Sequence, residues 1–292
     1  MSVLFLGSTI SINSSAYAGN QDVRYSPGRE PLVPRTDGRG VATFAGITRC
    51  VPSVAVQTLN VKTILAILAA SGAELPYLVL TDLKWIDRRV SSNAPTIDSG
   101  STAEQAAVTA GILAMTGIEA GADAPAVMSL LAYPTSSDGT TDPVAFTQVA
   151  APAEATAIAP FILDSVALDS TAIAEVSGVS LGIGIDWQIE HGLKPFPQLV
   201  RPRASDWTMT IRHRDRTIPR TKADKDSNAS FVLKDLQVGT STRGTQSVTF
   251  TVTGMIHQGD AGQTQDSSEI TTVVRGRFKT SGSVMPGTWA IV

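Results

Sequence analysis

The clearest pattern in the chain is a strict alternation of hydrophobic and polar residues over 179–190. Alternation with a period of two is typical of a long β-strand that buries one face. The polar face includes Gly182 and Gly184, which would let another backbone or subunit come close. The hydrophobic face would consist of the odd-numbered positions, Val179, Leu181, Ile183, Ile185, Trp187 and Ile189.

Shorter alternations predict that the C-terminal half is antiparallel β structure. The predicted strands cover 207–214, 246–256 and 270–280, and the first of them follows a loop at 195–202. Polar stretches rich in turn-forming residues predict mobile loops at 222–230 and 259–268.

The first half of the chain is more mixed. Asn60 precedes an apolar stripe at helical spacing and Gly72 follows it, which predicts an amphipathic helix over 61–71. Ser101 and Glu104 have the spacing of a capping box before an Ala-rich stretch, but glycines at 111, 117 and 121 interrupt it. We therefore expect a short helix there or none.

Further strands are expected around these segments. They cover 8–14, 126–133 and 143–149, and the last two flank a loop with a turn-forming Asp138-Gly139 pair. The Ala/Pro-rich segment 150–160 is either a domain boundary or a crossover between strands. The predicted fold is mainly β, an antiparallel β-sandwich or barrel with one or two peripheral α-helices. Residues 1–110 would form a mixed α/β module or insertion, and 111–292 an antiparallel β domain.

Composition argues against an enzyme. The 292 residues include one cysteine, Cys50, and three histidines, which leaves little material for a disulfide, a metal site or general-base chemistry. We expect no catalytic residue, no cofactor and no bound metal. The apolar run at 64–70 is too short to span a bilayer, so no membrane contact is expected. No basic residue precedes Arg24, which disfavours a secretory signal at the start.

Low charge points to buried surface between subunits. Only 17% of the residues are charged, against roughly 25% in a typical soluble domain. Residues 151–190 carry six acidic and no basic side chains, whereas 191–292 carry fourteen basic and eight acidic ones. This polarity suits packing of identical copies, acidic face against basic face, although a patchy surface is the alternative. The candidate inter-subunit residues are Arg201, Arg203, Arg212, Arg214 and Arg216; phosphate contact is their other possible use.

Two local motifs carry weaker signals. Residues 178–182 match the G-x-S-x-G pattern of a nucleophile elbow, but the alternation that follows places Ser180 inside a strand rather than at a strand-to-helix turn. Asp224, Asp226 and Asn228 have alternate spacing that could ligate Ca²⁺, yet no glycine bend or distant glutamate completes such a loop. A solvated loop is the better interpretation.

Several segments between 111 and 216 resemble a known family. They are Gly111-Ile112-Leu113-Ala114, 126–133, Ser137-Asp138-Gly139 with Pro143-Val144, 161–169 and Gly178-Val179-Ser180-Leu181. Their order, followed by the loop at 195–202 and a strand at 205–214, resembles virion structural proteins of tailed phages and prophages. The likeness is greatest to the major tail (tail-tube) protein. The first 110 residues match less well and would be an insertion or a second module.

The resemblance implies a structural virion protein, made in the host cytoplasm, that self-assembles into stacked rings. Residues 111–292 would be the tube-forming domain, and DNA would pass through the lumen without specific contacts. Other tail or head-completion proteins would be its further partners. Asp186 and Glu190 are the candidate lumen-facing residues, where they would repel phosphate.

Three alternatives remain at this stage. The chain could be another virion component, such as a head-decoration, capsid or baseplate protein. It could be a β-sandwich module that binds carbohydrate or a cell-surface ligand, with Trp85 and Trp289 as the sugar platform. A serine hydrolase would depend on Ser180 alone.

Overall fold

The fold is taken from a computed structural model that describes residues 4–32, 46–68, 75–90, 102–150, 158–215, 226–237, 242–264, 267–276 and 286–292. Within these ranges the chain is mainly antiparallel β structure with one helix, α1 (Val61–Leu68). The predicted fold class is confirmed in this form. The sheets do not close into a barrel, and the architecture is consistent with a β-sandwich.

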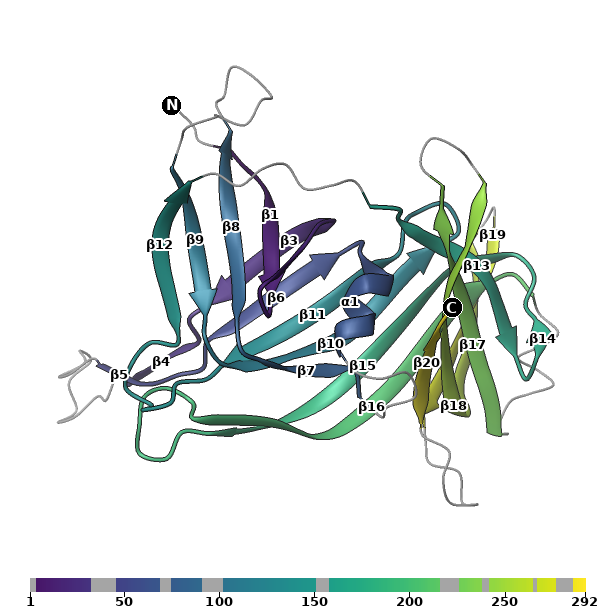
Figure 1. The fold of residues 1–292 in the computed structure, drawn as a ribbon. Coiled ribbons are helices and arrows are strands. Elements are labelled where there is room, and N and C mark those ends of the chain that lie inside the picture. Colours follow the sequence, from purple (N-terminus) through teal and green to yellow (C-terminus); the bar gives the residue numbers. More distant parts are fainter. Residues whose placement is uncertain are drawn as a thin grey trace.

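A five-stranded sheet, here called the small sheet, forms one layer (Figure 1). Each strand pairs antiparallel with its neighbour. Its order is β12 (Val144–Ala150), β9 (Thr102–Val108), β8 (Leu83–Val90), β1 (Leu4–Ile12) and β2 (Ser15–Tyr17).

The second layer is part of a thirteen-stranded sheet, here called the large sheet. Its path begins with β14 (Thr171–Ala172), β13 (Phe161–Leu168), β17 (Asp226–Leu236), β18 (Arg243–Thr264), β19 (Ser267–Gly276) and β16 (Leu199–His213). It continues with β15 (Val176–Glu190), β10 (Gly111–Gly121), β11 (Val127–Pro134), β6 (Ser53–Thr58) and β3 (Asn20–Ser26). Two further strands lie off this path and pair with strands inside it, β20 (Gly287–Ile291) with β18 and β7 (Tyr77–Leu80) with β10.

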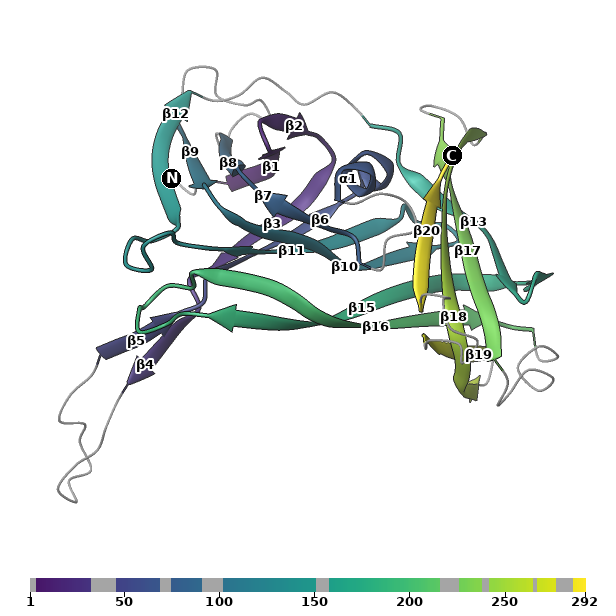
Figure 2. The ribbon, with the colours of Figure 1, turned by 60° about the horizontal axis from the view of Figure 1, so that its bottom comes forward.

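A separate two-stranded hairpin, β4 (Arg29–Leu32) and β5 (Gly46–Cys50), projects from the body of the molecule (Figure 2). A two-stranded hairpin by itself is at best marginally stable in water. The backbone N–H of Cys50 donates to the carbonyl oxygen of Pro195 at 2.9 Å, which ties the base of the hairpin to the rest of the chain.

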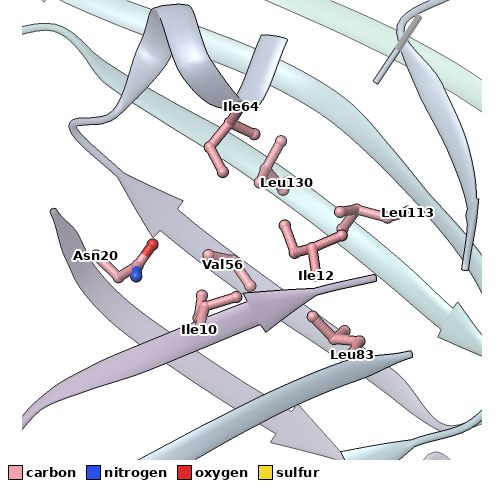
Figure 3. A pocket seen from close by; sticks show the side chains of 8 residues that line it. All are labelled: Ile10, Ile12, Asn20, Val56, Ile64, Leu83, Leu113 and Leu130. Carbon is pink, nitrogen blue, oxygen red and sulfur yellow. The ribbon is translucent and has the colours of Figure 1, made fainter. Parts of the chain in front are cut away.

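The core beneath the small sheet is fully packed. Side chains from both layers and from α1 meet there, as Figure 3 shows for Ile10 and Ile12 of β1 facing Leu113 and Leu130. The space among these side chains is too small to admit a water molecule. This region is therefore hydrophobic core and offers no room for a ligand.

A second group of buried aromatic side chains stabilises the C-terminal strands. Trp207 is fully buried and stacks against Trp289 with ring centroids 6.5 Å apart. Phe231 and Phe250 stack in the same way at 5.1 Å. These contacts hold β16, β17, β18 and β20 together and add attraction beyond the burial of area.

Several predicted elements are confirmed. The alternating strand at 179–190 lies within β15, and the predicted strand at 207–214 is the second half of β16, which begins earlier, at Leu199. The strands at 126–133 and 143–149 correspond to β11 and β12, and α1 begins at the predicted residue. Residues 69–71 of the predicted helix lie outside the described residues.

A short helix or none was expected at 102–121; no helix forms there, and the segment instead forms two strands that were not predicted, β9 and β10. β9 lies between β8 and β12, where Ala103, Ala106 and Val108 are buried. In β10, Gly117 stands opposite Gly182 of β15, and a Cβ there would lie 2.6 Å from the carbonyl oxygen of Leu181. The glycine therefore permits close strand pairing rather than ending an element.

Two predicted loops were also partly wrong. Residues 226–230 belong to β17, and residues 259–264 and 267–268 belong to the paired strands β18 and β19. Polar residues form strands here because each segment has a long partner strand. Residues 222–225 and 265–266 lie outside the described residues.

Hydrogen-bonded pairing crosses the predicted domain boundary at residue 110. β9 pairs with β12 in the small sheet, and β6 pairs with β11 in the large sheet. The division into 1–110 and 111–292 stays a prediction about folding units.

The packing around Trp207 generates a stability prediction. A Cβ at Gly287 would overlap the indole ring of Trp207, so Gly287→Ala should lower the free energy of unfolding by about 1–3 kcal/mol through overpacking. Gly182→Ala is the control. At the exposed Gly182 a Cβ would meet only the Thr208 carbonyl oxygen, at 4.0 Å, so this variant should change the free energy of unfolding by less than about 0.5 kcal/mol. Denaturant unfolding of both variants checks this. Equal effects would contradict the packing described for Trp207.

Candidate functional site

The candidate residues from the sequence lie mainly on one long hairpin, β15–β16. Both strands have fifteen residues, and they pair from Val176 opposite His213 to Glu190 opposite Leu199. Val179, Leu181 and Ile183 are buried, while Gly182, Gly184 and Asp186 are exposed on the opposite face. The first half of the alternating pattern therefore has the predicted orientation.

The distal half of the hairpin leaves the large sheet because another strand occupies its place. β15 pairs with β10 only at 178–182, and β7 pairs with the continuing edge of β10 at 111–114. Figure 2 shows the hairpin running as a separate layer alongside β10 and β11. Trp187 packs edge-on against Tyr133 of β11 with ring centroids 5.1 Å apart, which holds the two layers together.

Backbone hydrogen bonds fix the tip of this hairpin. The N–H of Phe196 donates to the Gly139 carbonyl at 3.0 Å, and the N–H of Ser136 donates to the Pro197 carbonyl at 2.8 Å. Gly139 has φ +67° and a Cβ there would lie 2.7 Å from the Lys194 Cβ, so glycine serves both the turn and the close approach. The tip is thus a fixed structure although Leu193 is fully exposed on it.

Asp138 organises the loop that receives the hairpin tip. Its carboxylate accepts hydrogen bonds from the backbone N–H groups of Thr140 and Thr141 and from the hydroxyls of Thr141 and Ser136, at 2.7–2.9 Å. These donors favour the charged form and hold the pKa of Asp138 far below its usual range. The predicted Asp138-Gly139 turn is therefore a connection between the two sheets rather than a hairpin turn.

The two candidate lumen-facing acids differ in their surroundings. Glu190 forms an ion pair with Arg201 at 3.4 Å and accepts a hydrogen bond from Gln188 at 2.7 Å, while Arg201 also donates to Gln188. Asp186 is exposed on the open face of β15. A candidate lumen acid and a candidate inter-subunit base thus pair within one chain.

Of the remaining candidate bases, Arg203 and Arg212 lie on β16 and Arg214 directly follows its last residue. Arg203, Arg212 and Arg214 are exposed, and Arg203 is the unpaired residue at the irregularity between Asp186 and Trp187. Arg216 lies outside the described residues.

Pairing within the chain also reduces the charge polarity along the sequence. Asp164 of the acidic segment forms ion pairs with Lys234, at 3.1 Å, and with Arg243. Acidic and basic segments lie in neighbouring strands, so part of their charge is neutralised before any copy meets another. A contact between copies stays a prediction for Arg201, Arg203, Arg212, Arg214 and Arg216.

A shallow groove of about 330 Å³ lies where β6, β11, β10 and β15 present their open faces. Gly117 and Gly182 form its floor, and its polar lining includes Gln57, Ser129 and Ser180. Glu119 is the one charged group that lines it. Ser180 lies in register with Thr210 inside a continuous strand, which does not form the turn that a nucleophile elbow needs.

The other candidate residues have a structural role or lie outside the described residues. His213 is fully buried and its Nε2 lies 2.8 Å from the Thr272 hydroxyl; burial lowers its pKa. Asp224 and the side chains of Asp226 and His257 are outside the described residues. Trp85 and Trp289 are buried, so neither presents the open ring face that a sugar platform requires.

Two kinds of feature are absent from the described residues. No group of three or more His, Cys, Asp or Glu side chains in these ranges is arranged to hold a metal ion. The helix in the described part of the chain is not long and apolar enough to cross a membrane.

The feature that the sequence interpretation missed is a set of strand edges without a partner among the described residues. β12 pairs only with β9, β20 only with β18, and β7 only with β10. Val79 of β7 and Phe146 of β12 are large apolar side chains with 61% and 51% exposure. The sequence signal for an unprotected edge at β12 is the complete absence of charge over 144–150.

Comparison with known proteins did not identify the chain: no protein-family model matches it, and no curated protein matches it.

The Asp138 loop generates a prediction with a pH dependence. Asp138→Ala should lower the midpoint temperature of unfolding by a few degrees at pH 7, because the four donors lose their shared acceptor. Because the pKa of Asp138 is lowered by folding, its stabilisation is present above the unfolded value of about 4 and is lost as the pH falls through the folded value. The difference between variant and wild type should therefore shrink below about pH 4.

Asp123→Ala is the matched control, since Asp123 is exposed between β10 and β11. Thermal unfolding of both variants at pH 7 and pH 3 makes the comparison. A loss of stability that is the same for both variants, or that persists unchanged in acid, would contradict the role assigned to Asp138.

Proposed function

We propose that this chain is a structural protein that self-assembles into stacked rings, as in a phage-type tail tube. The observation that carries the proposal is the number of strand edges without a partner among the described residues. Edge strands present rows of free N–H and C=O groups that pair readily with another chain. An assembly of identical copies satisfies these groups, and head-to-tail contacts that close generate rings.

One of these edges, β12, lacks the features that usually prevent such pairing. Charged side chains, prolines, bulges and very short strands protect sheet edges in monomeric proteins. β12 carries no charge and no proline over seven residues, and its pairing with β9 shows no irregularity. An unprotected edge of this kind in a chain with only 17% charged residues favours burial against another copy.

The rigid hairpin β15–β16 supports the same function. Its tip is fixed by hydrogen bonds, yet it exposes Leu193 completely and Leu199 by 43%. A fixed apolar projection is already organised for a contact, so little conformational entropy would be lost when a neighbouring ring covers it.

In this function DNA would pass through the ring lumen without specific contacts, and Asp186 remains the better of the two candidate lumen acids because Glu190 is paired. Other tail or head-completion proteins would be the further partners, and the virion would be the site of action. The same edges would also serve another virion component, such as a head-decoration, capsid or baseplate protein. The shallow groove is the one observation that favours a ligand-binding module instead.

Light scattering and negative-stain microscopy of the purified chain test the proposal. The expected result is a mass that is a multiple of 30.6 kDa and increases with concentration, together with rings or hollow tubes of uniform width. A 30.6 kDa species at every concentration, with no ring in the micrographs, would overturn it.

A further inference from the structure

The small sheet has one open edge on each side. On one side, β12 pairs with β9 and has no second partner among the described residues. On the other side, β2 covers β1 only at Ile10, Ser11 and Ile12. Residues 4–9 of β1 therefore also have a free edge within the part of the chain that the structure describes. The two free stretches have similar lengths, seven residues in β12 and six in β1, and the stretch of β1 carries a register shift between Leu6 and Thr9.

β12 differs from β3, β13 and β7 in lacking protection. β3 carries the ion pair of Asp22 with Arg24 and an irregular register, and β13 carries Asp164 and a register shift. β7 has four residues. Short length, charge and bulges discourage the pairing of edges in these strands, whereas β12 has none of the three.

The hydrophobic core is incomplete at the β12 edge. Trp85, Ala106 and Phe146 stand side by side in the register of β8, β9 and β12. Their exposure increases along this row from 4% and 2% to 51%, so the row of core side chains continues into solvent. Phe146 packs edge-on against Tyr25 of β3, an outer strand of the opposite layer, with ring centroids 5.6 Å apart. A further strand beside β12 would cover the exposed half of Phe146 and complete the core.

Strand direction determines which strand of a second copy can fill this place. β12, β9, β8 and β1 alternate in direction, so that β12 and β1 run antiparallel to each other. Rotation about a ring axis that runs along the strands preserves these directions. The free stretch of β1 in a neighbouring copy therefore meets β12 as an antiparallel strand, which is the more stable pairing.

We propose that β12 of one copy pairs antiparallel with residues 4–9 of β1 in the next copy, so that the repeat β12-β9-β8-β1 continues around a closed ring. This inference rests on the proposed self-assembly and names the surface that carries it. The partner is a second copy of this chain. The closed sheet would remove both open edges at once and bury Phe146 at the contact.

A pair of charge insertions tests the contact. Thr147→Lys with Val149→Lys places two lysines on β12 at alternate positions, where they should raise the concentration needed for assembly by at least about tenfold. The matched control is Ala55→Lys with Gln57→Lys, two exposed alternate positions on β6, which has neighbours on both sides. The control should assemble like the wild type.

The outcomes separate this inference from the proposed function. Assembly of the β12 variant at the wild-type concentration would overturn the assignment of β12 while leaving self-assembly intact. A wild-type chain that stays monomeric at all concentrations would overturn both.

Cysteine cross-linking tests the direction of pairing and does not depend on the lysine variants remaining folded. Both batches of protein carry Cys50→Ala, so that each has one cysteine. One batch carries Ser8→Cys and the other carries Thr147→Cys. A second pair of batches, with Thr9→Cys and Ala145→Cys, tests the adjacent register of the two strands. Disulfide-linked dimers in the mixture, with none in either batch alone, are expected. Cross-linking of the Thr147→Cys batch with itself would show a two-fold β12–β12 contact and overturn the head-to-tail pairing.

Discussion

Backbone hydrogen bonding between strands is the constraint on which the rest of this structure depends. With one helix among the described residues, most backbone groups can be paired only by a neighbouring strand. In β10, for example, both edges are paired. β11 pairs along one edge, and β7 and β15 each pair with a part of the other edge. The division forces the distal half of β15–β16 out of the large sheet. The same constraint leaves open edges where no further strand among the described residues supplies a partner.

The fixed position of the β15–β16 hairpin follows from this arrangement. A two-stranded hairpin is marginal by itself, so its tip needs support from elsewhere in the chain. The loop around Asp138 supplies that support through backbone hydrogen bonds to Phe196 and Pro197, and Trp187 adds a contact with Tyr133. One ion pair between described residues also lies within the hairpin, between Glu190 and Arg201. Surface ion pairs of this kind contribute little to stability, so hydrogen bonding and packing hold the hairpin.

Local patterns in the sequence were sufficient to predict β15 and α1. A buried face imposes a period of two on the strand at 179–190 and an apolar stripe at helical spacing on 61–68. They failed for β9, where Ser101 and Glu104 suggested a helix but pairing with β8 and β12 decided the conformation. They failed again at 259–264. This polar segment forms a strand because it pairs with β19. The ion pair of Glu190 with Arg201 could not be predicted from the sequence either, because the net charges of two segments do not show which strands become neighbours. Long-range pairing determined each of these outcomes.

Hydrogen exchange of the backbone amides in the assembled and the dilute chain tests the central claim most directly. If open strand edges drive self-assembly, the amides of residues 144–150 in β12 and 4–9 in β1 should become protected on assembly. The amides of β6, which already has partners on both edges, should change little. Assemblies in which the amides of β12 and β1 exchange as fast as in the dilute chain would contradict the account.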